Sequence, residues 1–553
     1  MLRRSYREDG KVKNQTLGNL SHLPEPLIEV IRRSLRGETF VPLGEAFEVV
    51  ASRSHGHVHA VALAMQRLGF ESVLGSKPSR ERDLTLAMIA ARIAAPHTKL
   101  ATTRWWHTTT LASDFGVADA SEDDLYAAMD WLLARQDAIQ KKLAARHLSQ
   151  GGLVLYDLSS SYFEGTCCPL AKLGYSRDGK RGLLQVNYGL LTNTRGCPVA
   201  VSVHEGNVSD STTFLPEVQR LREVFGIEQM VLVGDRGMLG HAIIGALREQ
   251  QGVDWITALK STSIRALVEE GQLQLGLFDE RNLVEITSPE YPGERLIACR
   301  NPQLATRRAH KREELLLATE TSLRAIQARV QAGRLTGADT IGVTVGKVVN
   351  RYKVAKHFEL DIGEERLSFQ RKHAAIAAEA MLDGIYIIRT SVESERMTAQ
   401  DCVRNYKSLA HVERAFRSLK TVDLKVRPIH HRSADRVRAH ILMCMLAYYV
   451  EWHMREAWRE LMFADTDQAA KATRDPVAPA QRSKAAHTKV NRRALEDGTP
   501  IHSFATLMAE LASLVRNTCR TPSAGNNAPT FEIETTPNPT QQRALELIKQ
   551  IQV

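Results

Sequence analysis

The sequence predicts an α/β protein in which a mixed β-sheet follows a mostly helical amino-terminal region. Two observations indicate this class: apolar residues recur at helical spacing up to about residue 148, and short apolar runs of strand length then alternate with helical patterns. The chain has 553 residues, of which 43% are hydrophobic and 25% are charged. This composition excludes a wholly disordered, collagenous or coiled-coil chain.

The first 148 residues should form a mostly helical region that begins with a β-hairpin. The pair Asp9-Gly10 lies between two stretches of strand length and favours a tight turn. Ser121 precedes an apolar helical pattern and should cap the helix that follows it. Helices are predicted over residues 25–36, 57–68, 83–95 and 122–147.

Residues 149–260 should form the first part of the sheet. The run 153–158 is apolar, as expected for a strand covered on both faces, whereas residues 182–191 and 198–204 alternate apolar and polar residues with period two. These three strands predict an antiparallel meander. Residues 230–235 are largely apolar again, which predicts a central strand that runs parallel to the first after a crossover helix. The remaining helices and the fifth strand are predicted at 211–224, 239–251 and 255–260.

Residues 261–381 carry mixed patterns and are interpreted as a β-rich insertion. Strand-like runs occur at 295–300 and 340–349, and a charged helix is predicted over 307–332. The six residues Arg307 to Arg312 are typical of the solvated start of a helix.

Residues 382–465 should complete the sheet. A strand is predicted at 385–390, followed by a helix that Thr398 caps and that continues past Lys420. A second helix, over 434–459, contains the longest apolar run of the chain. The last segment, 466–553, is interpreted as a helical region with linkers at 467–490 and 521–540, which are rich in small and polar residues.

Three acidic residues are the candidates for a catalytic site. Asp157 and Asp235 each end a predicted central strand, so their carboxylates would meet at one edge of the sheet if the strands are neighbours. Glu413 lies between Tyr406 and Lys420 at spacings of seven on a predicted helix, on a face that also carries apolar residues. An acid in such a face is costly unless it is paired or binds a cation. Three carboxylates suit Mg²⁺ or Mn²⁺, which support phosphodiester chemistry.

Each of these acids also has an ordinary structural explanation. An aspartate at the end of a strand commonly caps a turn or a helix. Glu413 could pair with Arg417, one turn further along the helix. The order of the acids along the chain and their context favour a common site.

The charge of the chain indicates a polyanionic partner. Lysine and arginine number 73 against 63 acidic residues, which gives a net charge of +10. Between Thr398 and His440 there are ten basic and four acidic residues, so this window contributes +6. The basic window is therefore the best candidate for gripping backbone phosphates.

The cysteines and the apolar runs limit the other classes. The seven cysteines are scattered and contain no CxxC pair, so a disulfide framework or a zinc ribbon is not expected. The longest apolar run, 441–450, is about half of what a membrane span requires. The amino terminus lacks the apolar stretch of a signal peptide. We expect a cytoplasmic protein without a membrane partner.

The chain resembles the DDE transposases of bacterial insertion sequences over roughly residues 1–460. The resemblance is carried by the strand with Asp157, the meander, the Gly-Asp-Arg-Gly segment around Asp235, the long insertion, and the helix Tyr406-x2-Leu409-x3-Glu413-x6-Lys420. This helix is similar to the Y-x2-R-x3-E-x6-K signature of one group in the family. Leu409 stands where that signature has its arginine.

The resemblance implies a ribonuclease H-like catalytic core interrupted by an insertion. By position, Asp157, Asp235 and Glu413 match the catalytic triad, and they would bind the metal, Mg²⁺ or Mn²⁺. The spacing of the acids fits a core that is interrupted only between the second and the third of them.

The resemblance also implies a set of DNA-binding residues. Tyr406 and Lys420 match signature residues that contact DNA near the cleaved end. Arg414 or Arg417 could replace the missing arginine. Further DNA contacts are expected from Arg236, next to Asp235, and from Arg427 in the basic window.

The implied function is that of a transposase that binds the double-stranded ends of its element, frees a 3′-hydroxyl by hydrolysis and joins it to target DNA. The region 1–148 would recognise the element ends, and the resemblance implies a homodimer assembled on DNA. Two alternatives remain: a metal-dependent nuclease of the same fold that cuts without joining, and a DNA-binding remnant that does not cut.

Overall fold

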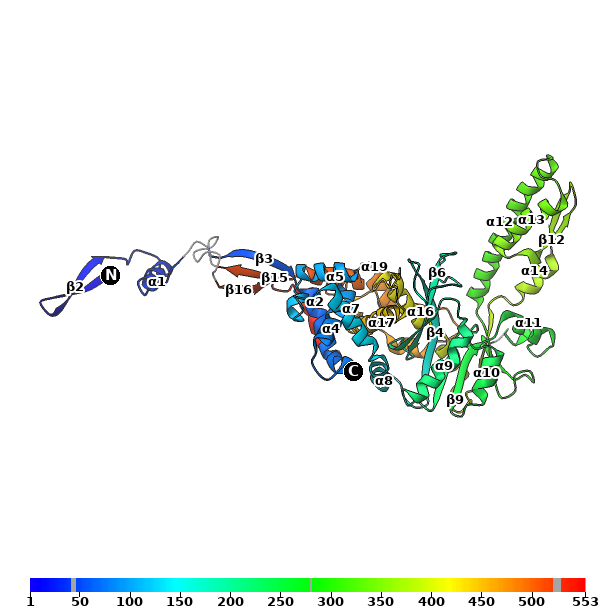
Figure 1. Cartoon of the computed structure of the whole chain (residues 1–553), viewed down its shortest axis with the longest axis horizontal. Coiled ribbons are helices and arrows are strands. Elements are labelled where there is room, and N and C mark those ends of the chain that lie inside the picture. Colours follow the sequence, from blue (N-terminus) through cyan, green and yellow to red (C-terminus); the bar gives the residue numbers. More distant parts are fainter. Residues whose placement is uncertain (41–45, 279–280, 521–528, 553) are drawn as a thin grey trace. The chain divides into compact units, whose positions relative to one another are not determined.

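The computed structural model describes residues 1–40, 46–278, 281–520 and 529–552, and the chain divides into two compact units (Figure 1). The first unit comprises Met1–Ser54 and Leu514–Thr536, and the second comprises His55–Ser513 and Pro537–Val553. Within the described ranges, no helix is both long enough and apolar enough to cross a membrane.

The first unit confirms the predicted hairpin and the first predicted helix. Strands β1 (Leu2–Glu8) and β2 (Lys11–Gly18) pair antiparallel, and both residues of the Asp9-Gly10 turn have positive φ, 53° and 74°, as a type I′ turn requires. Helix α1 spans Glu25–Ser34. A three-stranded sheet joins distant parts of the chain: β3 (Glu48–Ser54), β15 (Val515–Arg520) and β16 (Thr530–Glu534).

The helical region of the second unit contains seven helices among the described residues 55–148. The expected helix over 122–147 is wrong as a single element, because the chain leaves the helical conformation at Arg135, where φ is −107°. Helix α7 packs against α4 and the long helix α17 (Ala434–Ala457), whereas α8 packs against strand β7 (Pro198–Glu205). The predicted cap at Ser121 is confirmed. The helices are α2 (Gly56–Arg67), α3 (Phe70–Leu74), α4 (Arg80–Ala94), α5 (Lys99–Trp105), α6 (Leu111–Asp114), α7 (Glu122–Leu133) and α8 (Gln136–His147).

The main sheet is mixed and has nine strands in the described residues. Its central part has the order β7-β6-β4-β8-β9, in which β6 runs antiparallel to both β4 and β7, and β8 and β9 run parallel to β4. The predicted meander and the predicted parallel central strand are both confirmed. These strands are β4 (Gly152–Tyr162), β5 (Lys172–Leu173), β6 (Leu184–Thr192), β7 (Pro198–Glu205), β8 (Met230–Val233) and β9 (Val253–Ala258).

Helices cover both faces of this sheet. On one face, the ring of Tyr156 in β4 lies 5.9 Å from that of Phe214 in α9 (Asp210–Glu223), and α10 (His241–Arg248) packs beside α9. On the other face, α16 (Leu409–Arg417) packs against β4 and α17 against β7. Because successive side chains of a strand point to opposite faces, Asp157 faces the side of the sheet on which α16 lies.

The segment 261–381 is mainly helical, so the prediction of a β-rich insertion is wrong. Helix α12 (Pro302–Gln331) is 30 residues long, and the expected strand over 340–349 lies inside α13 (Ala338–Tyr352). Ile341, Val345 and Val349 recur every four residues and are buried in a core shared with α12, which explains the helix. The other elements are α11 (Ser261–Glu269), β10 (Leu283–Ile286), β11 (Arg295–Arg300), β12 (Phe358–Ile362), β13 (Leu367–Arg371) and α14 (His373–Ala380).

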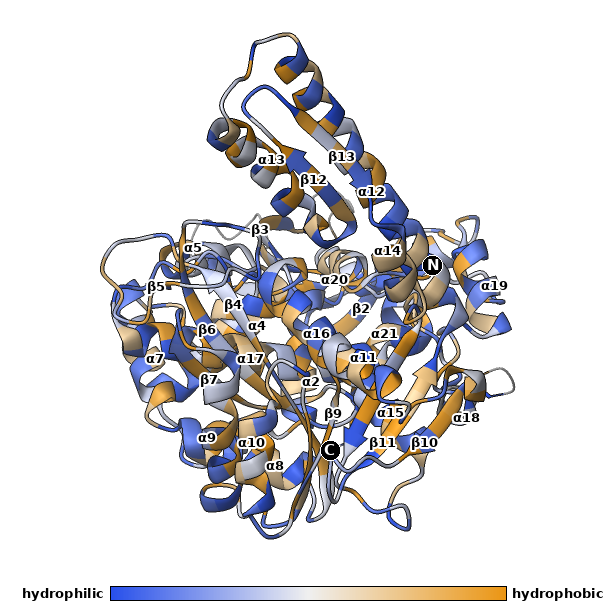
Figure 2. Ribbon diagram, turned by 90° about the vertical axis from the view of Figure 1, so that its right-hand side faces the viewer, coloured by the Kyte–Doolittle hydropathy of each residue, from blue (hydrophilic) through white to orange (hydrophobic). Residues whose placement is uncertain are grey.

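The insertion divides into two parts. Strands β10 and β11 extend the main sheet through β14 (Ile385–Thr390), which confirms the predicted strand at 385–390. Helices α12 and α13 and the hairpin of β12 and β13 form a separate layer with its own core, and Figure 2 shows this layer standing clear of the sheet.

The helix expected from Thr398 past Lys420 is interrupted. It consists of α15 (Ala399–Lys407), α16 (Leu409–Arg417) and a π-helical turn, Ser418–Val422. A π-turn adds one residue to the turn, so the residues beyond it no longer keep the face set by the spacing of seven.

The carboxyl-terminal segment has more structure than the predicted linkers. The linker predicted at 467–490 contains helix α18 (Gln468–Thr473) and most of helix α19 (Lys484–Arg492). The linker expected at 521–540 lies outside the described residues over 521–528, and β16 occupies 530–534. Helices α20 (Phe504–Ala512) and α21 (Pro539–Lys549) complete the chain.

Candidate active site

The two aspartates lie side by side at the same edge of the sheet. Leu155 of β4 pairs with Val233 of β8, in a parallel register that keeps a constant offset. Val233 is the last residue of β8, and Asp235 follows it by two residues, as Asp157 follows Leu155 within β4. Continued beyond the paired residues, the same offset would bring the two aspartates level with each other. Adjacent strands are about 4.8 Å apart. The expectation that these carboxylates meet depends on this pairing.

The carboxylate of Asp157 is half-buried among other acids. Burial raises its pKa to about 7, and the nearby carboxylates of Asp235 and Glu413 also raise it, whereas the amide of Leu158 and the guanidinium of Arg177 lower it. The Leu158 amide donates to Oδ1 of Asp157 at 2.8 Å. The influence of both other acids on this pKa shows that the three carboxylates share one electrostatic environment.

Glu413 reaches this environment from α16. Val412, Ala415 and Phe416 are buried on the face of α16 that packs against the sheet, and the ring of Phe416 lies 5.8 Å from that of Tyr188 in β6. Glu413 itself is exposed at the margin of this buried face. The apolar face therefore docks the helix, and the carboxylate is left at the edge where Asp157 lies.

Tyr406 joins α15 to the second aspartate. Its hydroxyl donates to Oδ1 of Asp235 over 3.4 Å. Burial raises the pKa of Tyr406, and the charge of Asp235 raises it further, so the phenol stays protonated and acts as a donor. Tyr406 thus orients Asp235.

The three acids suit a divalent cation by their chemistry. No lysine or arginine forms an ion pair with Asp157, Asp235 or Glu413 within the described part of the chain. Among the described residues, these three acids do not form a group whose ligand atoms all lie within 4.8 Å of one another. An oxygen donor set of this kind, without a paired lysine or arginine, fits a divalent cation.

A groove opens beside Asp235. Its walls include Arg236, Tyr406 and Lys407 together with Arg307 and Arg308 from the start of α12. The sequence indicated only that these two arginines lie in the solvated start of a helix. Their position beside Asp235 arises from tertiary packing, which the order of residues along the chain does not reveal. In the same stretch, Arg312 does form a partly buried ion pair, with Asp383.

The exposed arginines of α16 flank the glutamate. Arg414 and Arg417 follow Glu413 by one and four residues, and both are exposed. Leu409, at the position of the signature arginine, is half-buried at the start of α16. The two arginines are therefore accessible to a ligand that approaches the acids, and their replacement of the signature arginine stays a prediction.

Lys420 and Arg427 share one buried carboxylate partner. The side chain of Lys420 is 10% exposed, and its Nζ lies 3.0 Å from Oδ1 of Asp178, whose own side chain is 1% exposed. Arg427 pairs with the same oxygen. Lys420 lies within the π-turn, and its ammonium pairs with Asp178 of the loop between β5 and β6. Contacts of Lys420 and Arg427 with DNA stay predictions, and in the structure both cations already have a carboxylate partner.

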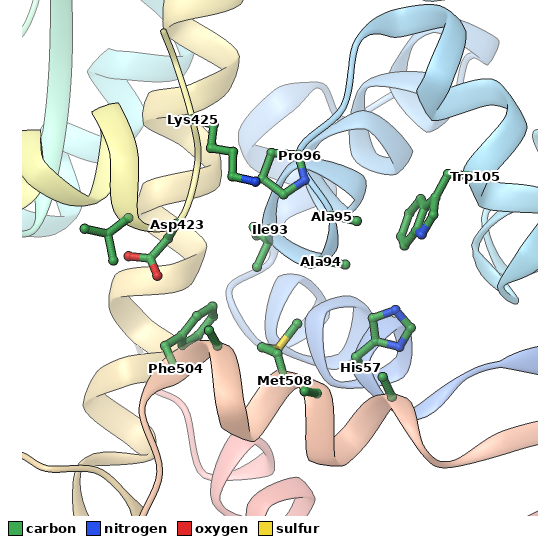
Figure 3. A pocket seen from close by; sticks show the side chains of 14 residues that line it. His57, Ile93, Ala94, Ala95, Pro96, Trp105, Asp423, Lys425, Phe504 and Met508 are labelled. Atoms are coloured by element: carbon green, nitrogen blue, oxygen red, sulfur yellow. The ribbon is translucent and has the colours of Figure 1, made fainter.

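A cluster of side chains and a second pocket lie outside this site. His147, Cys197 and His453 place ligand atoms within 4.8 Å of one another, but Cys197 Sγ lies 3.8 Å from Nε2 of His453 and His147 Nε2 lies 2.8 Å from the hydroxyl of Tyr449. A second pocket lies between α4, α20 and the segment after the π-turn, and Figure 3 shows its largely apolar lining. None of the three acids contributes to it.

Two family models match the chain. The family described as Transposase DDE domain matches residues 159–450, which include Asp235 and Glu413 and begin two residues after Asp157. The IS1634 family transposase, N-terminal domain, matches residues 1–41. The first match alone spans more than half of the chain, and it defines a transposase with a DDE domain. With the second match, it shows that the chain belongs to the DDE transposases of bacterial insertion sequences.

More distant comparisons add little. The chain is similar to a piggyBac transposase in a synaptic complex with hairpin DNA, solved by cryo-EM, with 8% identity and a TM-score of 0.36 over 82% of this chain and 77% of that one. A comparison with curated proteins gives no match.

Proposed function

We propose that this transposase cleaves the phosphodiester at the ends of its insertion sequence by metal-dependent hydrolysis and joins the freed 3′-hydroxyl to target DNA. The observation that carries the proposal is the placement of Asp157 in β4 and Asp235, two residues beyond the end of the neighbouring parallel strand β8, at one edge of the sheet, with Glu413 reaching the same edge from α16. The order β7-β6-β4-β8-β9, with its antiparallel and parallel pairs, supports a ribonuclease H-like core.

The acids would hold Mg²⁺ or Mn²⁺. When bound, such ions lower the pKa of an attacking water or hydroxyl and offset charge on the leaving oxygen. The chain's own residues prepare the site: the Leu158 amide fixes one oxygen of Asp157, Tyr406 orients Asp235, and the buried face of α16 holds Glu413 in place. The same carboxylates would serve hydrolysis and joining, because both displace one oxygen at phosphorus by another.

The surroundings of the acids favour double-stranded DNA as the substrate. Arg236, Arg307 and Arg308 line the groove beside Asp235, and Arg414 and Arg417 flank Glu413. Guanidinium groups around a set of acids would neutralise phosphates on either side of the one that reacts. We infer that the region 1–148 recognises the element ends and that two copies assemble on DNA.

The test is a reaction that separates cutting from joining. The purified chain is incubated with Mg²⁺ and a supercoiled plasmid that carries the gene with its native flanking DNA. The proposal predicts excised or nicked element ends and products in which these ends are covalently joined to a second plasmid. Cleavage without joined products would instead indicate a nuclease, and binding without cleavage would indicate a DNA-binding remnant.

A further inference from the structure

The loop 174–183, between β5 and β6, is basic and anchored beside the acids. It contains Arg177, Lys180 and Arg181 but only one acid, Asp178. Its sequence, with Gly179 and Gly182 at positive φ of 71° and 80°, favours a tight excursion between two strands. Neither the chain order nor the spacing of the acids indicated a role for this loop.

Asp178 ties the loop to three other segments. Its carboxylate accepts from Nζ of Lys420 at 3.0 Å and from the amide of Tyr162 at 3.3 Å, and it pairs with Arg427. The carboxylate is almost completely buried. A single buried acid therefore links the loop to the end of β4, the π-turn after α16, and the segment that follows it. Buried charges that are paired in this way hold a defined geometry, because breaking the pair is costly.

The strand that carries Asp157 fixes the other side of the loop. Ser160, three residues beyond Asp157, accepts from the amide of Arg177 at 3.1 Å and donates to the carbonyl of Tyr175 at 3.4 Å. The guanidinium of Arg177 pairs with Asp210, the first residue of α9. The loop therefore lies against the strand that carries Asp157.

The tip of the loop is left open to solvent. Tyr175 is 79% exposed, and Lys180 and Arg181 are exposed without an ion pair in the described part of the chain. Asp178 is buried and already pairs with Lys420 and Arg427, so it forms no ion pair with either of these cations. An exposed aromatic ring next to free cations is the combination that binds a nucleic-acid strand by stacking and phosphate contact.

We propose that the loop 174–183 is a DNA-contact element that binds the strand next to the scissile phosphate, an inference that rests on the proposed function. Lys180 and Arg181 contact backbone phosphates, and Tyr175 stacks on a base or sugar at the cleaved end. Lys420 and Arg427 are positioning residues that hold this loop through Asp178. Preorganisation of the loop would reduce the ordering cost of DNA binding.

The first experiment measures affinity for a short random-sequence duplex in EDTA across a salt series, with the full chain. The variant Lys180→Ala/Arg181→Ala should lower the slope of log affinity against log salt by about two units, because two phosphate contacts are lost. The control Arg492→Ala/Lys549→Ala removes the same charge from exposed positions on α19 and α21 and should leave the slope unchanged. If the loop variant keeps the wild-type slope, the proposal that the loop contacts DNA is overturned.

The second experiment probes stacking with a duplex whose frayed end carries 2-aminopurine. Binding of the wild type should quench its fluorescence, Tyr175→Phe should keep the quenching, and Tyr175→Ala should lose it. Equal quenching by Tyr175→Ala would remove Tyr175 from the contact. Both experiments omit the metal and therefore measure DNA binding alone. If the wild type binds no DNA, the proposed function is contradicted. If the loop variants bind DNA as the wild type does, only the proposed role of the loop is contradicted.

The positioning role of Lys420 is tested in combination with the loop. Lys420→Met should lower the salt slope and the quenching, and Lys420→Arg should restore both, since an arginine can still pair with Asp178. In the Lys180→Ala/Arg181→Ala background, Lys420→Met should change the slope no further. An additional loss of about one unit in that background would show instead that Lys420 contacts a phosphate directly.

Discussion

Lys420 and Asp178 form a buried ion pair, with Nζ of the lysine 3.0 Å from Oδ1 of the aspartate. The lysine occupies the last position of the Tyr-Glu-Lys signature, where the resemblance implied a direct contact with DNA. Burial lowers the pKa of Lys420, and Asp178 opposes this effect. The pair thus makes the signature lysine part of the structural support of the site.

Replacing Lys420 should destabilise the fold. Lys420→Met leaves Asp178 buried with only Arg427 as a charged partner, and the loss should be about 3 kcal/mol, the lower end of the cost of breaking a buried pair. Urea denaturation of wild type and variant measures this difference. Arg366→Ala, which breaks an exposed pair with Asp361, is the control and should cost less than about 1 kcal/mol. Equal stability of wild type and Lys420→Met would contradict a structural role of the pair.

Glu451 should make stability depend on pH. It is fully buried beneath the π-turn, where it accepts from Ser418 Oγ at 2.9 Å and pairs with Arg455, and burial raises its pKa from 4.5 to about 7. The protonated acid is favoured in the folded state. Its contribution to stability is therefore fully present below about pH 4.5 and is lost as the pH rises through about 7, by at most about 3 kcal/mol.

The variant Glu451→Gln keeps the shape of the side chain but cannot ionise. Its stability relative to the wild type should therefore increase between about pH 5 and about pH 8. Denaturation curves at both pH values measure the change. If the difference in stability between Glu451→Gln and the wild type is the same at both pH values, Glu451 does not titrate in this range.

The arginines of α16 should contribute to DNA affinity without contributing to stability. Arg414→Ala/Arg417→Ala removes two exposed cations next to Glu413 and should lower the salt slope of duplex binding by about two units. The denaturation midpoint should stay that of the wild type, since neither side chain is buried. Unchanged affinity would mean that the DNA does not pass along this face of α16.

Tyr406 should affect catalysis more than binding. Tyr406→Phe removes the hydroxyl that donates to Asp235 over 3.4 Å, a long bond worth about 1 kcal/mol, so the cleavage rate should fall by roughly five-fold. Duplex affinity in EDTA should be unchanged. Tyr126→Phe, which removes a similar bond to Glu122 on α7, is the control and should leave the rate unaltered. A large loss of affinity in Tyr406→Phe would assign the hydroxyl to DNA instead.

Much of the sheet could be predicted because local patterns determine it. Period-two alternation at Leu184–Thr192 and the apolar run at Met230–Val233 predicted the strands, and the parallel pairing of β4 with β8 brings the ends that carry Asp157 and Asp235 to the same edge. Glu413 was predicted as a site residue because its helix carries a motif. These assignments depend on short segments whose patterns are unambiguous.

The errors have physical causes of two kinds. In α13, glycines and β-branched residues resemble a strand, although Ile341, Val345 and Val349 recur at helical spacing and determine the outcome through packing on α12. The π-turn at Ser418–Val422 depends on tertiary contacts of Ser418 and Asp423 with Glu451 and Arg455, which no local pattern reveals. Asp178 and Arg308 were missed for the same reason.

The most direct test of the account is cleavage by variants of the three acids. Asp157→Asn, Asp235→Asn and Glu413→Gln keep the size of each side chain and are assayed with Mg²⁺ on the plasmid carrying the element, with duplex affinity in EDTA measured in parallel. Glu164→Gln, an exposed acid just beyond β4, is the control and should cleave normally. The account predicts that each of the three variants binds DNA but cleaves only at background. Near wild-type cleavage by any one of them would contradict the assignment of that residue to the site.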